Sequence, residues 1–149
     1  MQRHVVIDTN SLLQILGAHS KYNYLFDKFL DEEFVLCISN DILLEYEEIL
    51  KAKASPLAAD LFLKTIVHSQ NVLRKDPYYR LNLISSDPDD NKFVDCAFAC
   101  QAEYVVTDDT HFSILKTIPF PVIFVKSLDK FCEDYPDAHS SLICDDSEI

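Results

Sequence analysis

The stretch VVIDTNSLL, residues 5–13, begins with three β-branched apolar residues and continues with an acid and three small polar residues. An uninterrupted apolar run is typical of a strand buried on both faces, because a half-exposed strand would alternate. This strand would end at Asp8, whose charge is costly to bury without compensation. Two interpretations stay open on this stretch alone. Asp8 either caps a helix that begins near Leu12 or belongs to a functional site.

Outward from this stretch, the chain alternates between strand and helix signals. Strands are predicted at 4–8, 34–39, 71–75, 104–108 and 122–125. Helices are predicted at 10–16 and 20–31, after Ser39, after Pro56, from the acids at 87–90 to about Gln101, at 110–116 and at 127–133. In the helix after Pro56, the residues expected to face inward are Leu57, Leu61, Ile66 and Val67. This alternation predicts an α/β fold with a parallel sheet covered on both faces.

The composition bounds the protein further. The 149 residues predict a single domain at 1–132, followed by a flexible tail at 133–149 that holds six acids and no Lys or Arg. No apolar run is long enough to cross a bilayer and the first residues lack a signal peptide, so we expect a cytoplasmic protein without membrane partners. The single glycine, Gly17, excludes a glycine-rich phosphate loop. Five cysteines without a Cys-x-x-Cys pair indicate neither a disulfide framework nor a zinc site.

Carboxylates gather in four segments of the chain. They are Asp8 in the first stretch, Glu45 in NDILLEYEEIL, the acids of SSDPDDNKFVDCA (Asp87, Asp89, Asp90 and Asp95) and Asp108 with Asp109 in VVTDDTHF. The functional crevice of a parallel sheet lies at the carboxyl ends of its strands, where Asp8 and the Asp108–Asp109 pair are predicted to lie. Each acid alone could be a cap, a turn residue or a solvated charge. Together they would repel one another unless divalent cations neutralise them, and an all-oxygen ligand set favours Mg²⁺ or Mn²⁺.

In this combination and order, the segments resemble the PIN-domain family over about residues 3–126, and most closely its bacterial branch of toxins from toxin–antitoxin pairs. The resemblance implies a three-layer α/β/α sandwich around a five-stranded parallel sheet. It implies catalytic and metal-binding roles for Asp8, Glu45, Asp90 and Asp109, with Asp95 as an additional metal ligand. The supporting residues are Thr9 and Asn10 beside Asp8, and Thr107, the threonine of a T-x-D motif. Asn91 stays open as the alternative to Asp90, and Asp108 as the alternative to Asp109.

The resulting hypothesis is an endoribonuclease that uses one or two Mg²⁺ or Mn²⁺ ions and leaves a 3′-hydroxyl and a 5′-phosphate. The resemblance also implies an RNA substrate, a small antitoxin partner and a homo-oligomer. Two other classes remain as alternatives: a phosphoacceptor or phosphatase-type α/β domain, with Lys126 after the fifth strand, and a catalytically inactive PIN-like binding module. His111 is expected at the surface or in a cap rather than as a proton shuttle. For Tyr46, Tyr78 and Tyr79, packing is favoured over base stacking.

Overall fold

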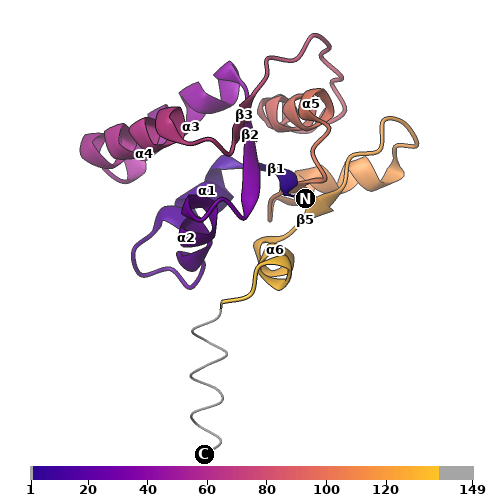
Figure 1. Ribbon diagram of the computed structural model, residues 1–149. Coiled ribbons are helices and arrows are strands. Elements are labelled where there is room, and N and C mark those ends of the chain that lie inside the picture. The colour runs from indigo at the N-terminus through magenta and orange to yellow at the C-terminus, as the bar shows by residue number, and fades with distance from the viewer. Residues whose placement is uncertain (1, 138–149) are drawn as a thin grey trace, which may run out of the picture.

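The computed structural model describes residues 2–137 and places five parallel strands in one central sheet (Figure 1). The strands are β1 (Arg3–Ile7), β2 (Phe34–Ile38), β3 (Val72–Arg74), β4 (Tyr104–Val106) and β5 (Val125–Lys126). Their order across the sheet is β3-β2-β1-β4-β5. β1 lies in the centre, with Val5 opposite Leu36 on one side and Tyr104 on the other. The predicted α/β fold with a five-stranded parallel sheet is confirmed.

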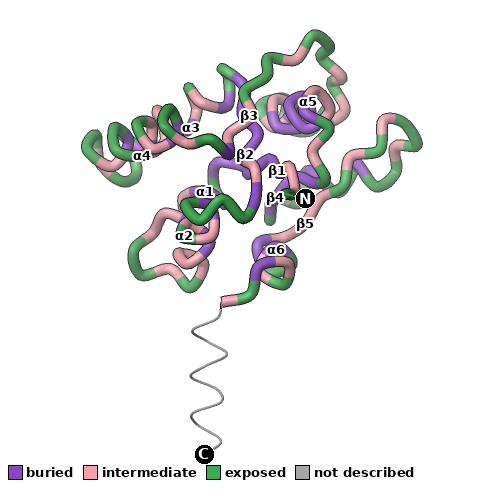
Figure 2. Tube along the Cα trace, in the orientation of Figure 1, coloured by how far each residue is buried: buried purple, intermediate pink, exposed green. Residues whose placement is uncertain are grey.

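Helices form a layer on each face of the sheet. The α-helices are α1 (Thr9–Leu16), α2 (Tyr24–Leu30), α3 (Asn40–Lys53), α4 (Pro56–His68), α5 (Asn91–Cys100) and α6 (Leu128–Asp134), and the 3₁₀ helices are η1 (Pro88–Asp90) and η2 (Thr110–Thr117). Phe34 of β2 packs against Phe29 of α2 and Phe131 of α6, with ring centroids 5.9 and 5.2 Å apart. α5 packs against β1, β2 and β4 on the opposite face. Figure 2 shows buried segments of β1, β2 and β4 between these layers.

Helix starts follow local chemistry that the sequence predicts. Ser39 accepts a hydrogen bond from the Ile42 amide, 3.3 Å away, and begins α3. Ser55 does the same for α4 through the Ala58 amide, at 3.0 Å, with Pro56 at the first helical position. Caps of this kind contribute about 1 kcal/mol each, and proline at the first position loses no intrahelical hydrogen bond.

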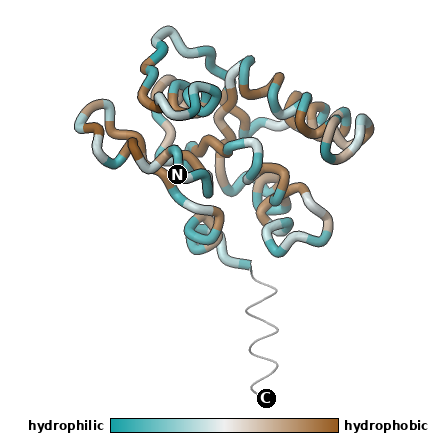
Figure 3. Tube along the Cα trace, turned by 180° about the vertical axis from the view of Figure 1, so that it is seen from behind, coloured by the Kyte–Doolittle hydropathy of each residue, from teal (hydrophilic) through white to brown (hydrophobic). Residues whose placement is uncertain are grey.

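The predicted inward face of α4 is wrong for three of its four residues. Ile66 is buried, but Leu57, Leu61 and Val67 are 67%, 57% and 74% exposed. The buried stripe instead consists of Ala59, Phe62 and Ile66. Phe62 packs edge-on against Tyr46 of α3, with ring centroids 6.0 Å apart, and this contact sets the rotation of α4. Figure 3 shows the resulting mixture of hydrophobic and hydrophilic residues along the outer helices.

The fifth strand is shorter and lies later in the chain than predicted. It comprises only Val125 and Lys126, whereas the prediction covered 122–125. Pro119 and Pro121 precede it, and proline has no amide hydrogen to donate to a sheet. The Phe124 carbonyl still accepts a hydrogen bond from the Val105 amide at 2.9 Å. The side chains of Phe120, Val122 and Phe124 are all exposed.

The C-terminal part of the described chain packs against the sheet. α6 continues to Asp134, and the ring of Tyr135 lies 5.3 Å from the rings of both Phe34 and Phe131. Most of the predicted acidic tail, residues 138–149, lies outside the described residues. Among residues 2–137, no helix is both long and apolar enough to cross a membrane.

Candidate active site

Asp8 stands where β1 ends and α1 begins, and its two carboxylate oxygens do different things. Oδ1 accepts a hydrogen bond from the Ser11 amide, 2.8 Å away, and so caps α1. Oδ2 accepts a hydrogen bond from the hydroxyl of Thr107, which follows β4. The residue is only 6% exposed. Asp8 therefore is a helix cap, and its second oxygen joins a polar cluster contributed by a distant part of the chain.

Thr107 connects the ends of β1 and β4. Besides donating to Asp8, its hydroxyl oxygen accepts a hydrogen bond from the Asp109 amide at 3.0 Å. The parallel pairing of Ile7 with Val106 places these two strand ends side by side. Asp108 turns elsewhere, because its Oδ1 accepts a hydrogen bond from the Leu128 amide at 3.1 Å. Of the two neighbouring acids, geometry favours Asp109 as the member of the site.

Four side chains converge beside this junction: Asp87, Asp90, Asp109 and His111, here called the acidic group. Each offers one ligand atom, and these atoms all lie within 4.8 Å of one another. His111 Nδ1 lies 3.2 Å from Asp109 Oδ1, 3.6 Å from Asp90 Oδ2 and 3.7 Å from Asp87 Oδ2. Asp90 Oδ2 is buried without a hydrogen-bond partner among the described residues. Buried oxygens are rarely left this way unless water or an ion satisfies them.

Two carboxylates of the site, those of Asp8 and Asp90, resist ionisation. Burial, followed by the negative charges of Asp109 and Asp87, raises the pKa of Asp90 from 3.8 to about 7, although His111 opposes the rise. Burial also raises the pKa of Asp8, against the opposing effect of its hydrogen bonds from Thr107 and Ser11. A bound cation would favour the ionised forms and remove this penalty. The electrostatics of the site therefore suit a positively charged ligand.

Glu45 reaches the same edge of the sheet from α3. Its Oε2 accepts a hydrogen bond from the hydroxyl of Thr9, the residue after Asp8. Its Oε1 lies 2.6 Å from Lys92 Nζ, and the two side chains are 24% and 20% exposed. The hydrogen bond to Thr9 holds Glu45 next to Asp8, and Lys92 balances its charge.

Two other predicted residues fix the loop before η1. Asn91 accepts a hydrogen bond from the Ile84 amide and donates one to the Ile84 carbonyl, both at 2.9 Å. Asp95 is 7% exposed, and its Oδ1 accepts a hydrogen bond from the Leu81 amide at 3.1 Å. Of the predicted metal ligands, the structure places Asp90 and Asp109 in the acidic group. Asp8, Glu45 and Asp95 are not part of it, and neither is Asn91. Asn10 is exposed at the start of α1.

Three residues of the site were absent from the predicted ligand set. Asp87 caps η1 by accepting a hydrogen bond from the Asp89 amide, and it also faces His111. Asp87 and Asp90 are three residues apart, and this spacing predicts that their side chains lie on the same side of a helical turn. His111 lies two residues after Asp109; it is exposed, as predicted, and it also belongs to the acidic group. Nothing in the sequence pattern predicts Lys92 as a site residue, apart from its position in an acidic segment.

The site is compatible with the predicted cation. The acidic group offers three carboxylates and one imidazole, and Asp90 Oδ2 lacks a hydrogen-bond partner among the described residues. Oxygen-rich donor sets suit Mg²⁺ and Mn²⁺, and imidazole suits several transition metals. The phosphoacceptor alternative finds less support, since Lys126 Nζ is 2.7 Å from Asp134 Oδ2 at the other end of α6.

Residues 4–111 match the family model described as PIN domain, which covers most of the chain. The chain belongs to the PIN-domain family. No curated protein matches the sequence. Several solved structures share the fold of this PIN domain at low sequence identity.

One of these structures is the Rickettsia felis VapBC2 complex bound to a DNA fragment from its promoter. This PIN domain matches one of its chains with a TM-score of 0.58 and 16% identity, over 83% of the present chain and 98% of the other. The Mycobacterium tuberculosis VapC20, a sarcin–ricin-loop-cleaving toxin, matches with a TM-score of 0.52 and 15% identity, over 73% and 92% of the two chains. The PIN domain endonuclease Utp24 matches with a TM-score of 0.50 and 20% identity, over 83% and 84%.

Proposed function

We propose that this PIN domain is a Mg²⁺- or Mn²⁺-dependent endoribonuclease and the toxin of a toxin–antitoxin pair. The observation that carries the proposal is the buried Oδ2 of Asp90, which has no hydrogen-bond partner among the described residues and lies among the carboxylates of Asp87 and Asp109. Membership of the PIN-domain family supports it. So do the structural relatives, one described as a sarcin–ricin-loop-cleaving toxin and one as an endonuclease.

In this proposal, the ions are held by the carboxylates of Asp8, Glu45, Asp90 and Asp109, with Asp87 and His111 as further donors. When bound, such ions neutralise the charge on the scissile phosphodiester and lower the pKa of a water molecule that attacks phosphorus. The donors come from the ends of β1 and β4, from α3 and from the segment that begins α5.

The chain's own residues orient and balance these donors. Thr107 holds Asp8 Oδ2 and the Asp109 amide with the same hydroxyl, and Thr9 holds Glu45 Oε2. Fixing a carboxylate through a second residue reduces the reorganisation needed on binding a cation. We propose that Lys92 Nζ, 2.6 Å from Glu45 Oε1, also attracts the RNA phosphate toward the site.

We also propose a small antitoxin protein as a partner, on the pattern of the VapBC2 complex. An Arg or Lys of the antitoxin that enters the acidic group would occupy the place of the cation and block cleavage. A homo-oligomer remains a prediction that rests on the resemblance to the PIN-domain family.

The experiment compares Asp8→Asn with wild type for Mn²⁺-dependent cleavage of a structured RNA. We expect a loss of at least about 100-fold, because the amide removes a negative charge from the proposed ligand set. Asp108→Asn is the matched control and should keep activity within about threefold. The Asp108 side chain accepts a hydrogen bond from the Leu128 amide and lies outside the acidic group. Circular dichroism checks that both variants fold. Cleavage by folded Asp8→Asn at the wild-type rate would exclude the assignment.

A further inference from the structure

The segment RKDPYYR, residues 74–80, presents two neighbouring aromatic side chains to solvent. Tyr78 is 97% exposed and Tyr79 is 70% exposed. Tyr46, by contrast, is fully buried, in agreement with the predicted core or surface packing. Exposed aromatic rings forgo the free energy of burial, so two in succession indicate a surface that a ligand covers.

The same segment concentrates cations that have no acidic partner. The chain has 13 Lys and Arg residues and a net charge of −12. Within residues 2–137, Arg74, Lys75 and Arg80 make no ion pair with a carboxylate, whereas seven of the other Lys and Arg residues do. These three residues lie within seven positions of one another. In a strongly acidic protein, such a local concentration of unpaired positive charge favours a polyanionic ligand.

The acids nearest to these cations already accept hydrogen bonds from the protein. Asp76 accepts bonds from the backbone amide and the side-chain amide of Asn40, both at 2.8 Å. Asp95 accepts one from the Leu81 amide. Arg74 is held over the same loop by a hydrogen bond to the side chain of Asn40. Arg74 and Lys75 donate to neutral oxygens, those of the Asn40 side chain and the Ala99 carbonyl, so these hydrogen bonds leave their positive charges unneutralised.

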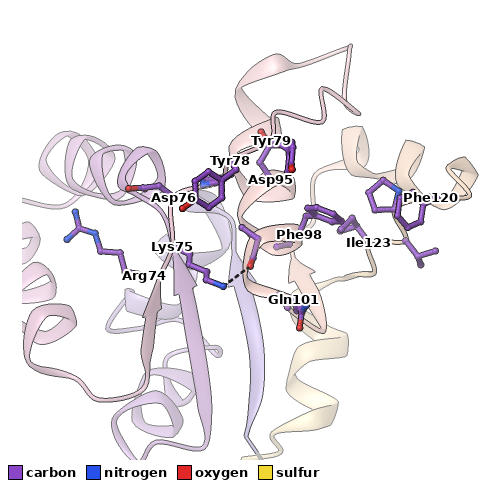
Figure 4. Close-up of a pocket in the computed structure, with 16 residues that line it drawn as sticks. Arg74, Lys75, Asp76, Tyr78, Tyr79, Asp95, Phe98, Gln101, Phe120 and Ile123 are labelled. Carbon is purple, nitrogen blue, oxygen red and sulfur yellow. Dashed lines mark hydrogen bonds between the residues drawn. The ribbon is translucent and has the colours of Figure 1, made fainter.

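Two connected hollows join this segment to the candidate active site. Figure 4 shows the larger one, of about 820 Å³, with Lys75, Tyr78 and Tyr79 on one wall. The second, of about 480 Å³, shares Pro77 and Asp95 with the first and is lined by Arg80 and Lys92. Lys92 is the residue that pairs with Glu45 in the site. The second hollow is also lined by Asp89 and Asn91, the chain neighbours of Asp90, so nucleotides that leave the site can extend through the two hollows toward the tyrosines.

We propose that this path binds a single-stranded segment of the RNA substrate. Bases stack on Tyr78 and Tyr79, and phosphates lie against Arg74, Lys75 and Arg80. Stacking on exposed rings requires unpaired bases, which a duplex does not offer, so the site selects single-stranded RNA. This inference rests on the proposed ribonuclease function, because it extends the substrate site of that enzyme.

The test measures binding of a short fluorescent single-stranded RNA in EDTA, where metal-dependent cleavage does not occur. The double variant Tyr78→Ala/Tyr79→Ala should bind at least about 25-fold more weakly than wild type, because each of the two lost stacking contacts weakens binding by about fivefold or more. The variant Tyr78→Phe/Tyr79→Phe keeps both rings and should bind within about twofold of wild type. Phe124→Ala is the matched control: it removes an exposed aromatic ring that lines neither hollow, and it should bind like wild type.

The possible outcomes separate this inference from the proposed function. Equal binding by wild type and the double alanine variant overturns the stacking site. The stacking site is also overturned if the double phenylalanine variant loses as much RNA affinity as the double alanine variant does. Equally tight binding of a matched duplex overturns the selection of single strands. Mn²⁺-dependent cleavage of RNA by wild type is measured in parallel. If cleavage is absent while the tyrosine-dependent binding remains, the ribonuclease proposal fails and the RNA site stands.

Discussion

Replacement of Asp90 by asparagine should stabilise the metal-free protein. In the folded chain, burial and the charges of Asp109 and Asp87 raise the pKa of Asp90 from 3.8 to about 7. The folded state therefore binds this proton more tightly than the unfolded state does. As the pH rises from about 3.8 to about 7, ionisation lowers the free energy of unfolding, and above that range the penalty is constant.

The magnitude follows from the same pKa values. The full rise corresponds to about 4 kcal/mol at about 1.36 kcal/mol per pH unit. The Asp90 side chain is 15% exposed, and its charged neighbours Asp87 and His111 are more exposed, at 39% and 45%. Screening by water reduces the penalty to about 1–2 kcal/mol. Asparagine has no charge and adds an amide donor beside two carboxylates, so it should recover this amount.

The assay is thermal unfolding in EDTA at pH 8 and at pH 5. At pH 8, Asp90→Asn should unfold roughly 3–6 °C above wild type. At pH 5, the folded wild type already holds the proton, so the difference should shrink to about a third. Saturating Mn²⁺ should reverse the order, because ions that bind only the folded wild-type site stabilise it. Asp60→Asn, an exposed acid on α4, is the control and should change little. A variant less stable than wild type in EDTA at pH 8 would refute the reasoning.

Two further predictions concern a supporting residue and the core. Thr107→Val removes the hydroxyl that holds Asp8 and the Asp109 amide, and it should weaken Mn²⁺ binding by about 10–100-fold in calorimetry; an unchanged affinity would contradict the positioning role. Phe62→Ala should lower the free energy of unfolding by about 3–5 kcal/mol, because the ring is buried against Tyr46. The neighbouring Leu61→Ala should change it by about 0.5 kcal/mol or less in the same urea titrations, and equal losses would show that the orientation of α4 is wrong.

The sequence by itself determined the order of the strands and helices and the edge where the acids meet. Apolar runs such as VVI at 5–7 and serines such as Ser39 and Ser55 act within a few residues, through burial and capping, so a linear pattern contains the information. The carboxyl ends of parallel strands share one edge, and this rule alone places Asp8 near the later acids. The five-stranded parallel fold was predictable for these reasons.

Only the tertiary structure decided which acids face the site. Asp108 and Asp109 are adjacent, as are Asp90 and Asn91, and their directions depend on partners far along the chain. The Leu128 amide donates a hydrogen bond to the Asp108 side chain, and the backbone of Ile84 makes two hydrogen bonds with the Asn91 side chain.

The same holds for the buried stripe of α4 and for Lys92 beside Glu45. Helical periodicity says which residues share a face, but it does not say which of two apolar faces finds a partner. Because Phe62 packs against Tyr46, the face of α4 with Leu57 and Leu61 is left exposed. Contacts between distant segments form only when the whole chain has folded, and for that reason no local pattern of residues specifies them.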